Sequence, residues 1–264
     1  MAAPYPWLEL ACAACFIASC FMVIIGMFGQ VEGGGFDSRG AWFPWHPVYM
    51  ALSYPCCMGL GRLAYVARMR ASINVRRALH ACFMGCGVVA AALGYYAIFA
   101  AHWPGGKFFG YNFQQHEWKS GDGSLARILH SWLGYAVLGA SFVQGCSGPL
   151  KIKAIAAGQR AHTWHGKLGK YIILGAMANL LLAVYFWPWS LRMKFLLCCL
   201  FTAAGLLAAM LPRHSGQPFS ALPMVTDGQG KQIGAARMGD LGLMVTSAAA
   251  DDAQSNELAQ LAVS

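Results

Sequence analysis

Apolar residues along the chain gather into six long runs, separated by short polar or glycine-rich segments. A helix of about 20 apolar residues spans roughly 30 Å of hydrocarbon, and each run is close to that length. None alternates like a porin strand, so helices are the structures that satisfy the backbone within lipid. The pattern predicts six transmembrane helices, at about residues 7–28, 46–66, 79–101, 128–148, 163–187 and 193–211.

The composition agrees with a location in a membrane. Of the 264 residues, 58% are hydrophobic and 11% are charged, whereas about 25% of the residues of a soluble domain are charged. The first run has no preceding Lys or Arg and is longer than the core of a secretory signal, so we expect it to stay as helix one. The predicted fold class is an all-α integral membrane protein, with residues 1–212 as the six-helix domain.

Positive charge is concentrated in two connections. Four arginines lie between the second and third runs. Three basic residues lie between the fourth and fifth runs, and two more lie at the start of the fifth. By the positive-inside rule, both loops are expected to face the cytosol. With six spans, both termini are then cytosolic. The net charge of +9 therefore reflects topology, and no nucleic-acid partner is expected. Residues 213–264 are rich in small and polar residues and poor in aromatics, which indicates a mostly disordered tail.

Four histidines occupy matched positions at the starts of the four middle runs. His46 and His80 are 34 residues apart, and His130 and His165 are 35 apart, so each pair marks one helical hairpin. Because successive spans run in opposite directions, His46 and His130 come near the non-cytosolic face, and His80 and His165 near the cytosolic face. The two hairpins predict a four-helix bundle made of helices two to five.

Histidines that face each other in twos are typical of haem ligation. Two imidazoles from facing helices serve as axial ligands of one haem iron and leave no open position, which suits electron transfer. Zinc fits less well, because a tetrahedral site needs three or four protein ligands at one point. A lone histidine at a helix end is more often a hydrogen-bonded interfacial residue. The prediction of two haem b groups therefore depends on the matched positions of all four.

Several motifs surround these histidines: WHPVYM at 45–50, RALH at 77–80, LHSWLG at 129–134, FVQ at 142–144 and HGKLG at 165–169. Together they resemble the cytochrome b561 family of transmembrane electron-transfer proteins, over about residues 8–211. The family's four haem-ligating histidines match His46, His80, His130 and His165, in the pairs given above. His162 is an alternative haem ligand to His165, because each histidine is followed by a glycine four residues later. The spacing between the two histidines of each hairpin favours His165.

The resemblance implies a transmembrane oxidoreductase that depends on ascorbate. Cytosolic ascorbate would reduce the inner haem, the electron would pass to the outer haem, and monodehydroascorbate or a ferric chelate would accept it. The resemblance also implies a multi-pass protein of a vesicle, vacuolar or lysosomal, endoplasmic reticulum or plasma membrane, in contact with membrane lipid. The resemblance is also compatible with a homodimer.

Basic residues near the histidines are the candidate substrate contacts. Arg76, Arg77 and Arg160 lie shortly before the cytosolic-side histidines, where a cationic rim would hold the ascorbate anion by charge-assisted hydrogen bonds. The same arginines equally fit a topology signal that binds lipid headgroups. On the other face, His102 and His116 lie in the long connection at 101–127, which we expect to be irregular. They would bind or protonate the acceptor, or equally be solvated loop residues.

A second class of function stays open, a proton or metal transporter lined by histidines. A transporter predicts ionisable residues and helix interruptions near the middle of the spans. Asn179 is the main polar residue there, and Pro55 is the clear interior proline. The sequence therefore favours electron transfer over transport.

Overall fold

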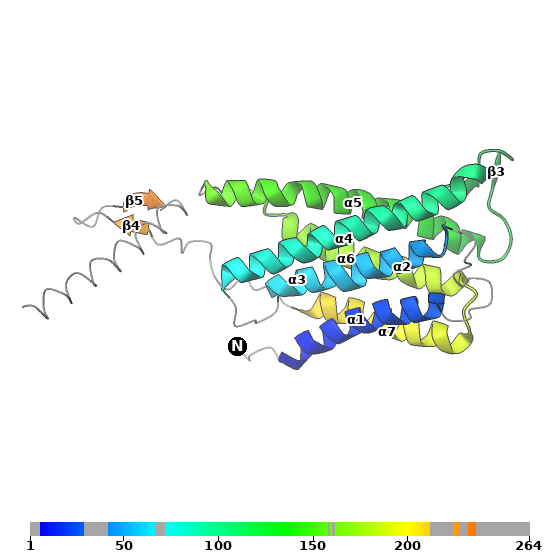
Figure 1. Cartoon of the computed structure of the whole chain (residues 1–264), viewed down its shortest axis with the longest axis horizontal. Helices are drawn as coiled ribbons and strands as arrows, with labels where there is room; N and C mark the ends of the chain where they lie inside the picture. The colour runs from blue at the N-terminus through cyan, green and yellow to red at the C-terminus, as the bar shows by residue number, and fades with distance from the viewer. Residues whose placement is uncertain are drawn as a thin grey trace, which may run out of the picture. The chain divides into compact units, whose positions relative to one another are not determined.

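The chain is mainly helical in the computed structural model (Figure 1). The structure describes residues 6–28, 42–66, 72–157, 159, 162–211, 224–226 and 232–235. The α-helices are α1 (Pro6–Phe28), α2 (Trp45–Ala51), α3 (Gly59–Val66), α4 (Ile73–His102), α5 (Ser124–Ala156), α6 (His165–Phe186) and α7 (Leu191–Met210). A π-helix, η1 (Leu52–Met58), joins α2 to α3. The prediction of a helical chain is confirmed.

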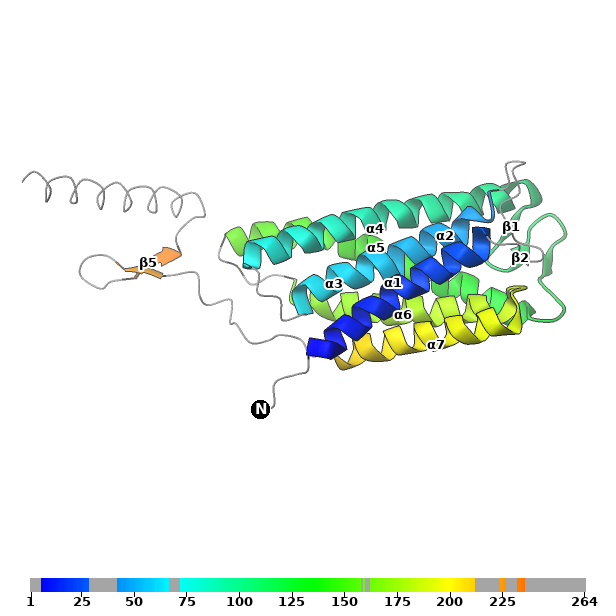
Figure 2. The same cartoon turned by 60° about the horizontal axis from the view of Figure 1, so that its bottom comes forward.

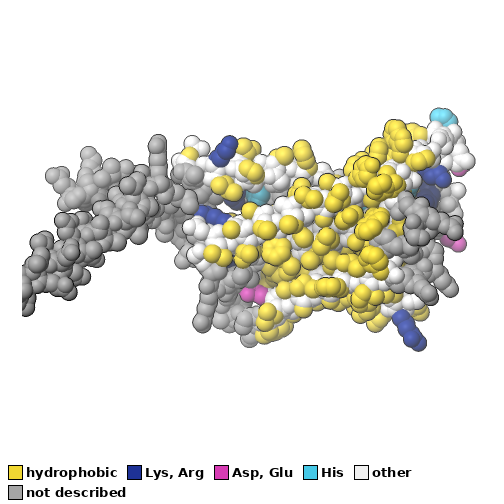
Figure 3. Space-filling view, in the orientation of Figure 1, with side chains coloured by type: hydrophobic (Ala, Val, Ile, Leu, Met, Phe, Trp, Pro, Cys, Tyr) yellow, Lys and Arg dark blue, Asp and Glu magenta, His cyan; other side chains and the backbone are white. Residues whose placement is uncertain are grey.

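Four helical stretches are long and apolar enough to cross a membrane: Trp7–Phe28, Asn74–Gly105, His165–Phe186 and Leu191–Met210. Figure 3 shows hydrophobic side chains over much of the visible face of the helices, with the charged side chains mostly towards their ends. Large apolar side chains are exposed on these helices, among them Leu10, Phe21 and Val89. An exposed apolar surface of this extent indicates a membrane protein.

The other two predicted spans also lie on helices, with two differences. Residues 45–66 form one continuous helical stretch, but its middle widens into η1 around Pro55. Proline lacks an amide N–H, and its ring crowds the carbonyl four residues back, so a wide turn is favoured there. The other difference is length, since α5 continues past the predicted end at residue 148 to Ala156.

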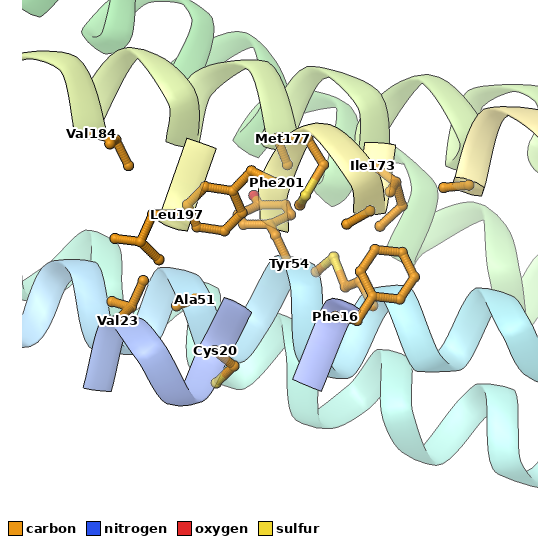
Figure 4. Packing of buried hydrophobic residues seen from close by; sticks show 14 of the residues in the cluster. Phe16, Cys20, Val23, Ala51, Tyr54, Ile173, Met177, Val184, Leu197 and Phe201 are labelled. Atoms are coloured by element: carbon orange, nitrogen blue, oxygen red, sulfur yellow. The ribbon is translucent and has the colours of Figure 1, made fainter. Parts of the chain in front are cut away.

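Tight packing joins α1 to α7, α7 to α6, and α2, η1 and α3 to α4 (Figures 1 and 2). Figure 4 shows the core between α1 and α7, where Phe16 and Phe201 are each 1% exposed. Gly59 lets α3 approach this core, because a Cβ there would lie 2.8 Å from the Phe16 ring. Among the described residues, α5 has no comparably close backbone approach to another helix. The backbone of α5 therefore stands farther from its neighbours than the backbones of the other long helices do.

The connection between α4 and α5 is folded, which corrects the expectation of an irregular loop. After a short 3-10 turn, η2 (Trp103–Gly105), it forms an antiparallel sheet of β1 (Lys107–Phe108), β2 (Tyr111–Asn112) and β3 (Glu117–Trp118). Each strand is only two residues long. Sequence patterns identify a strand by the alternation of apolar and polar residues over at least about four positions, so these strands could not be predicted. Left-handed glycines at 106 and 110 allow the tight turns around β1.

The chain divides into two compact units, residues 1–147 with 164–213, and residues 148–163 with 214–264. The first unit holds most of the helical domain predicted for residues 1–212. In the second, the described part of the C-terminal region is a pair of antiparallel strands, β4 (Met224–Thr226) and β5 (Gln232–Ala235). The rest of the predicted tail lies outside the described residues.

Candidate functional site

Four histidine side chains meet in two pairs, well separated along the helices. The rings of His46 on α2 and His130 on α5 have their centres 6.3 Å apart, with planes at 89°. The rings of His80 on α4 and His165 on α6 are 6.4 Å apart, with planes at 66°. The ring that faces His80 thus belongs to His165, while the rival His162 precedes α6 in a left-handed backbone conformation.

The separation of the rings leaves room for one metal ion in each pair. A metal–imidazole bond is about 2.0 Å long and a ring nitrogen lies about 1.2 Å from the ring centre, so two imidazoles on opposite sides of one ion have centres about 6.4 Å apart. The two measured separations match this value. Among the described residues, no three His, Cys, Asp or Glu side chains converge as zinc would require.

Hydrogen bonds fix the orientation of each ring. Three of the four Nδ1 atoms donate to backbone carbonyls of the neighbouring helix: His46 to Gly94 (2.9 Å), His80 to Gly61 (2.8 Å) and His130 to Asn179 (3.0 Å). A carbonyl can only accept, so these rings carry their proton on Nδ1. In this tautomer Nε2 carries the lone pair, which is the form in which most histidines bind a metal.

His165 is held by side chains instead. Its Nδ1 lies 3.0 Å from the Ser147 hydroxyl, which donates its own proton to the Gln144 carbonyl at 2.9 Å. The hydroxyl therefore accepts from the imidazole. The Gln144 amide also donates to the His165 carbonyl at 2.8 Å. Sequence reasoning missed Ser147, because a serine in an apolar helix gives no signal; Gln144 was visible only as part of the FVQ motif.

The His46–His130 pair opens into a cavity of about 470 Å³, a size typical of ligand and cofactor sites. Three buried polar groups in its wall have no hydrogen-bond partner among the described residues: the indole N–H groups of Trp187 and Trp189, and Asn179 Oδ1. Buried polar groups are normally paired. These three atoms have no surface open to the cavity, so the fit of an occupant depends on the lining, which is mostly apolar and aromatic and suits a largely apolar group such as haem.

The comparisons with known proteins leave the family open. No model of a known protein family and no curated protein matches the sequence. The resemblance to cytochrome b561 proteins therefore depends on the motifs around the histidines and stays a prediction.

The predicted arginines near His80 have defined contacts. Arg76 donates to two carbonyls at the end of α3, Ala64 O at 3.0 Å and Tyr65 O, so it caps that helix, where a cation is favourable. Arg77 hydrogen-bonds to the Tyr65 side chain, whose ring meets the His80 ring edge-on at 4.7 Å. Tyr65 thus connects Arg77 to the histidine pair.

The remaining predicted substrate residues are dispersed. His102 lines the cavity, and its ring lies 5.9 Å from that of Phe43. His116 is exposed in the turn before β3 and does not line the cavity. Arg160 lies outside the described residues. Sequence reasoning missed Lys119 and Arg127, which do line the cavity; the position of Arg127 three residues before His130, like Arg77 before His80, was the available signal.

Proposed function

We propose that the chain carries electrons across a membrane through two haem b groups, one held by His46 and His130 and the other by His80 and His165. The observation that carries the proposal is the spacing of the two ring pairs with their fixed Nδ1 hydrogen bonds. The proposal includes six transmembrane spans, with α2–η1–α3, α4, α5 and α6 as a four-helix core. In this arrangement α1 and α7 support the core without supplying ligands.

The histidines hold and orient the two groups. A haem with two imidazole ligands has no open coordination position and transfers single electrons. Gly94, beside His46, and His80 are 14 residues apart on α4, which is about 21 Å of helix at about 1.5 Å per residue. The pairs are then suited to opposite edges of a hydrocarbon layer about 30 Å thick.

The donor and acceptor follow from the resemblance and from charge. Ascorbate would bind at the end of the helical core that carries Arg77. Tyr65 hydrogen-bonds to Arg77, and its ring contacts the ring of His80. The acceptor, monodehydroascorbate or a ferric chelate, would reach the cavity next to His46 and His130. The protein would then act as a transmembrane oxidoreductase in one of the cellular membranes given above.

The test is an optical spectrum of the purified chain, oxidised and then titrated with ascorbate, with haem measured per chain. We expect two low-spin haems that ascorbate reduces. His80→Ala and His130→Ala should each disturb a different one of the two spectral centres. A matched control is His102→Ala. His102 lines the cavity, but among the described residues its ring is not part of either histidine pair.

One outcome would end this proposal: a colourless protein after expression with ample haem. A histidine-lined proton or metal transporter would then come first. The observation that favours it is the π-helix at Leu52–Met58 around Pro55, since interrupted helices are common in transporters. Proton or metal flux into vesicles that contain the protein would test it.

A further inference from the structure

The mouth of the cavity next to His46 and His130 carries an excess of positive charge. Lys107, Lys119 and Arg127 all line it, and Glu117 is the one acidic residue among the described residues that do. Asp122 belongs to the same connection but does not line the cavity. We call Lys107, Lys119 and Arg127 the cationic rim.

The small sheet positions two members of the rim. The turn after β1 docks on α5 through Gly110, where a Cβ would lie 2.5 Å from the Ile128 side chain and the backbone has φ +80°. Only glycine allows this close approach. The Lys119 amide donates to the Gly110 carbonyl at 2.9 Å. The residue after β3 is thereby held beside the first turns of α5, which carry Arg127.

Aromatic contacts reinforce this docking. The Phe109 ring lies 4.4 Å from that of Tyr135 and 5.2 Å from that of Trp132, both on α5. The Arg127 guanidinium lies 5.4 Å above the Phe186 ring, in cation–π geometry. Phe186 in turn packs edge-on against His130 at 5.4 Å. The rim and the histidine pair are therefore connected through direct contacts.

The charges of the rim are not neutralised within the described part of the chain. None of its three members forms an ion pair there. Partial burial, followed by the charges of Arg127 and Lys107, lowers the pKa of Lys119, so the three cations repel one another. A cleft lined by charges of one sign attracts ligands of the opposite sign.

We propose that the cationic rim is a binding site for a small anion with several carboxylate groups. Three cations and one glutamate leave an excess of two positive charges at the opening, which matches several negative charges better than the single charge of an ascorbate-type anion. Carboxylates also accept the charge-assisted hydrogen bonds that Arg and Lys donate. A free, hydrated ferric ion would be repelled from the same opening.

The role of this anion as electron acceptor rests on the proposed function, whereas the binding site itself does not. As an acceptor, the anion would bring one ferric ion, which takes up one electron and becomes ferrous. At the other end one ascorbate would give up that electron and one proton, and become monodehydroascorbate. The rim holds the anion and excludes cations, and it takes no part in the proton transfer.

The test uses the full chain in nanodiscs of neutral phosphatidylcholine, titrated with citrate in a calorimeter. We expect citrate to bind at least about 100-fold more tightly than acetate, and Lys119→Gln or Arg127→Gln to weaken citrate binding about tenfold each. Arg192→Gln is the matched control, because Arg192 is an exposed cation at the start of α7 and does not line the cavity. This control should leave the affinity unchanged.

Each other outcome has a definite meaning. Citrate binding that is absent, or unaffected by the rim variants, would overturn the proposal. Loss of citrate binding when anionic phosphatidylglycerol is added to the nanodiscs would identify the rim as a lipid-headgroup site and also overturn it. Haem is measured on the same samples: haem without citrate binding removes only the rim site, and citrate binding without haem removes only the electron-transfer proposal.

Discussion

The two helical hairpins orient their histidines by different means. In the first hairpin, α2 to α4, both histidines donate to glycine carbonyls across the hairpin, at Gly94 and Gly61. In the second, α5 and α6, one histidine donates to the Asn179 carbonyl and the other to the Ser147 hydroxyl. The first hairpin therefore relies wholly on backbone acceptors, and the second relies partly on a side chain.

The difference follows from how closely the helices approach. A Cβ at Gly94 would lie 3.1 Å from the Tyr49 Cβ, and one at Gly61 would lie 3.0 Å from the Phe83 Cβ, so glycine lets α4 pack directly on α2 and α3. On α5, which stands off from its neighbours, Ser147 spans the remaining space. The first hairpin should therefore be sensitive to added volume, and the second to loss of a hydroxyl.

Removal of histidines in pairs should have the largest effect. We expect His46→Ala with His130→Ala to leave one haem per chain, because both changes remove ligands of the same group. His46→Ala with His80→Ala should leave none, because each group then keeps one ligand. Haem content and the low-spin spectrum measure this. One remaining haem after His46→Ala with His80→Ala, and none after His46→Ala with His130→Ala, would show that the pairs are wrongly assigned.

Added volume in the first hairpin should have the next largest effect. Gly94→Val should push α2 away from α4, lengthen the bond from His46 and weaken haem binding at that pair by about 10- to 100-fold, as loss of a ligand's supporting hydrogen bond does. Gly61→Val should do the same at the other pair. The control is Gly85→Val on the same helix, where a Cβ meets nothing within 4 Å. Equal haem loss in all three variants would indicate general unfolding.

Loss of the hydroxyl in the second hairpin is a milder change. Ser147→Ala removes the acceptor for His165 but adds no volume, so we expect a shifted reduction potential and up to about tenfold weaker binding at the His80–His165 pair only. Ser147→Thr should restore both. Ser141→Ala is matched, since Ser141 is also buried on α5 and donates to a backbone carbonyl. A shift of equal size in the control would assign the effect to α5 as a whole.

The sequence predicted the helical chain because long apolar runs depend on local composition alone. It did not predict the π-helix at 52–58, because Pro55 marks a disturbance of the helix but not which kind, a kink, a break or a widened turn. It also missed the sheet between α4 and α5. That sheet packs on α5 through long-range contacts, such as Gly110 against Ile128, which no local pattern reveals.

At the site, the spacing of the histidines along the chain was sufficient to single out the four rings. The groups that orient them were not visible, because a backbone carbonyl such as that of Gly61 has no residue type that identifies it. Arg76 is a different case. Its charge and position predict a substrate contact, which stays a prediction, and in the structure its guanidinium also bonds to the carbonyls that end α3.

The smallest expected effect concerns pH at the cationic rim, beside the first of the two pairs. Because partial burial and the charges of Arg127 and Lys107 lower the pKa of Lys119, this lysine loses its charge at a lower pH than an ordinary lysine, whose pKa is about 10.4. Citrate binding should therefore weaken severalfold between about pH 7 and pH 10.

A substitution that keeps the charge separates Lys119 from its neighbours. Arginine stays protonated throughout the range, so Lys119→Arg should bind citrate with a flatter pH profile than the natural chain. The control is Lys194→Arg, because Lys194 bonds to the Tyr185 carbonyl and does not line the cavity. Titration calorimetry at several pH values measures the profiles. Identical slopes in all three proteins would exclude Lys119 as the titrating group.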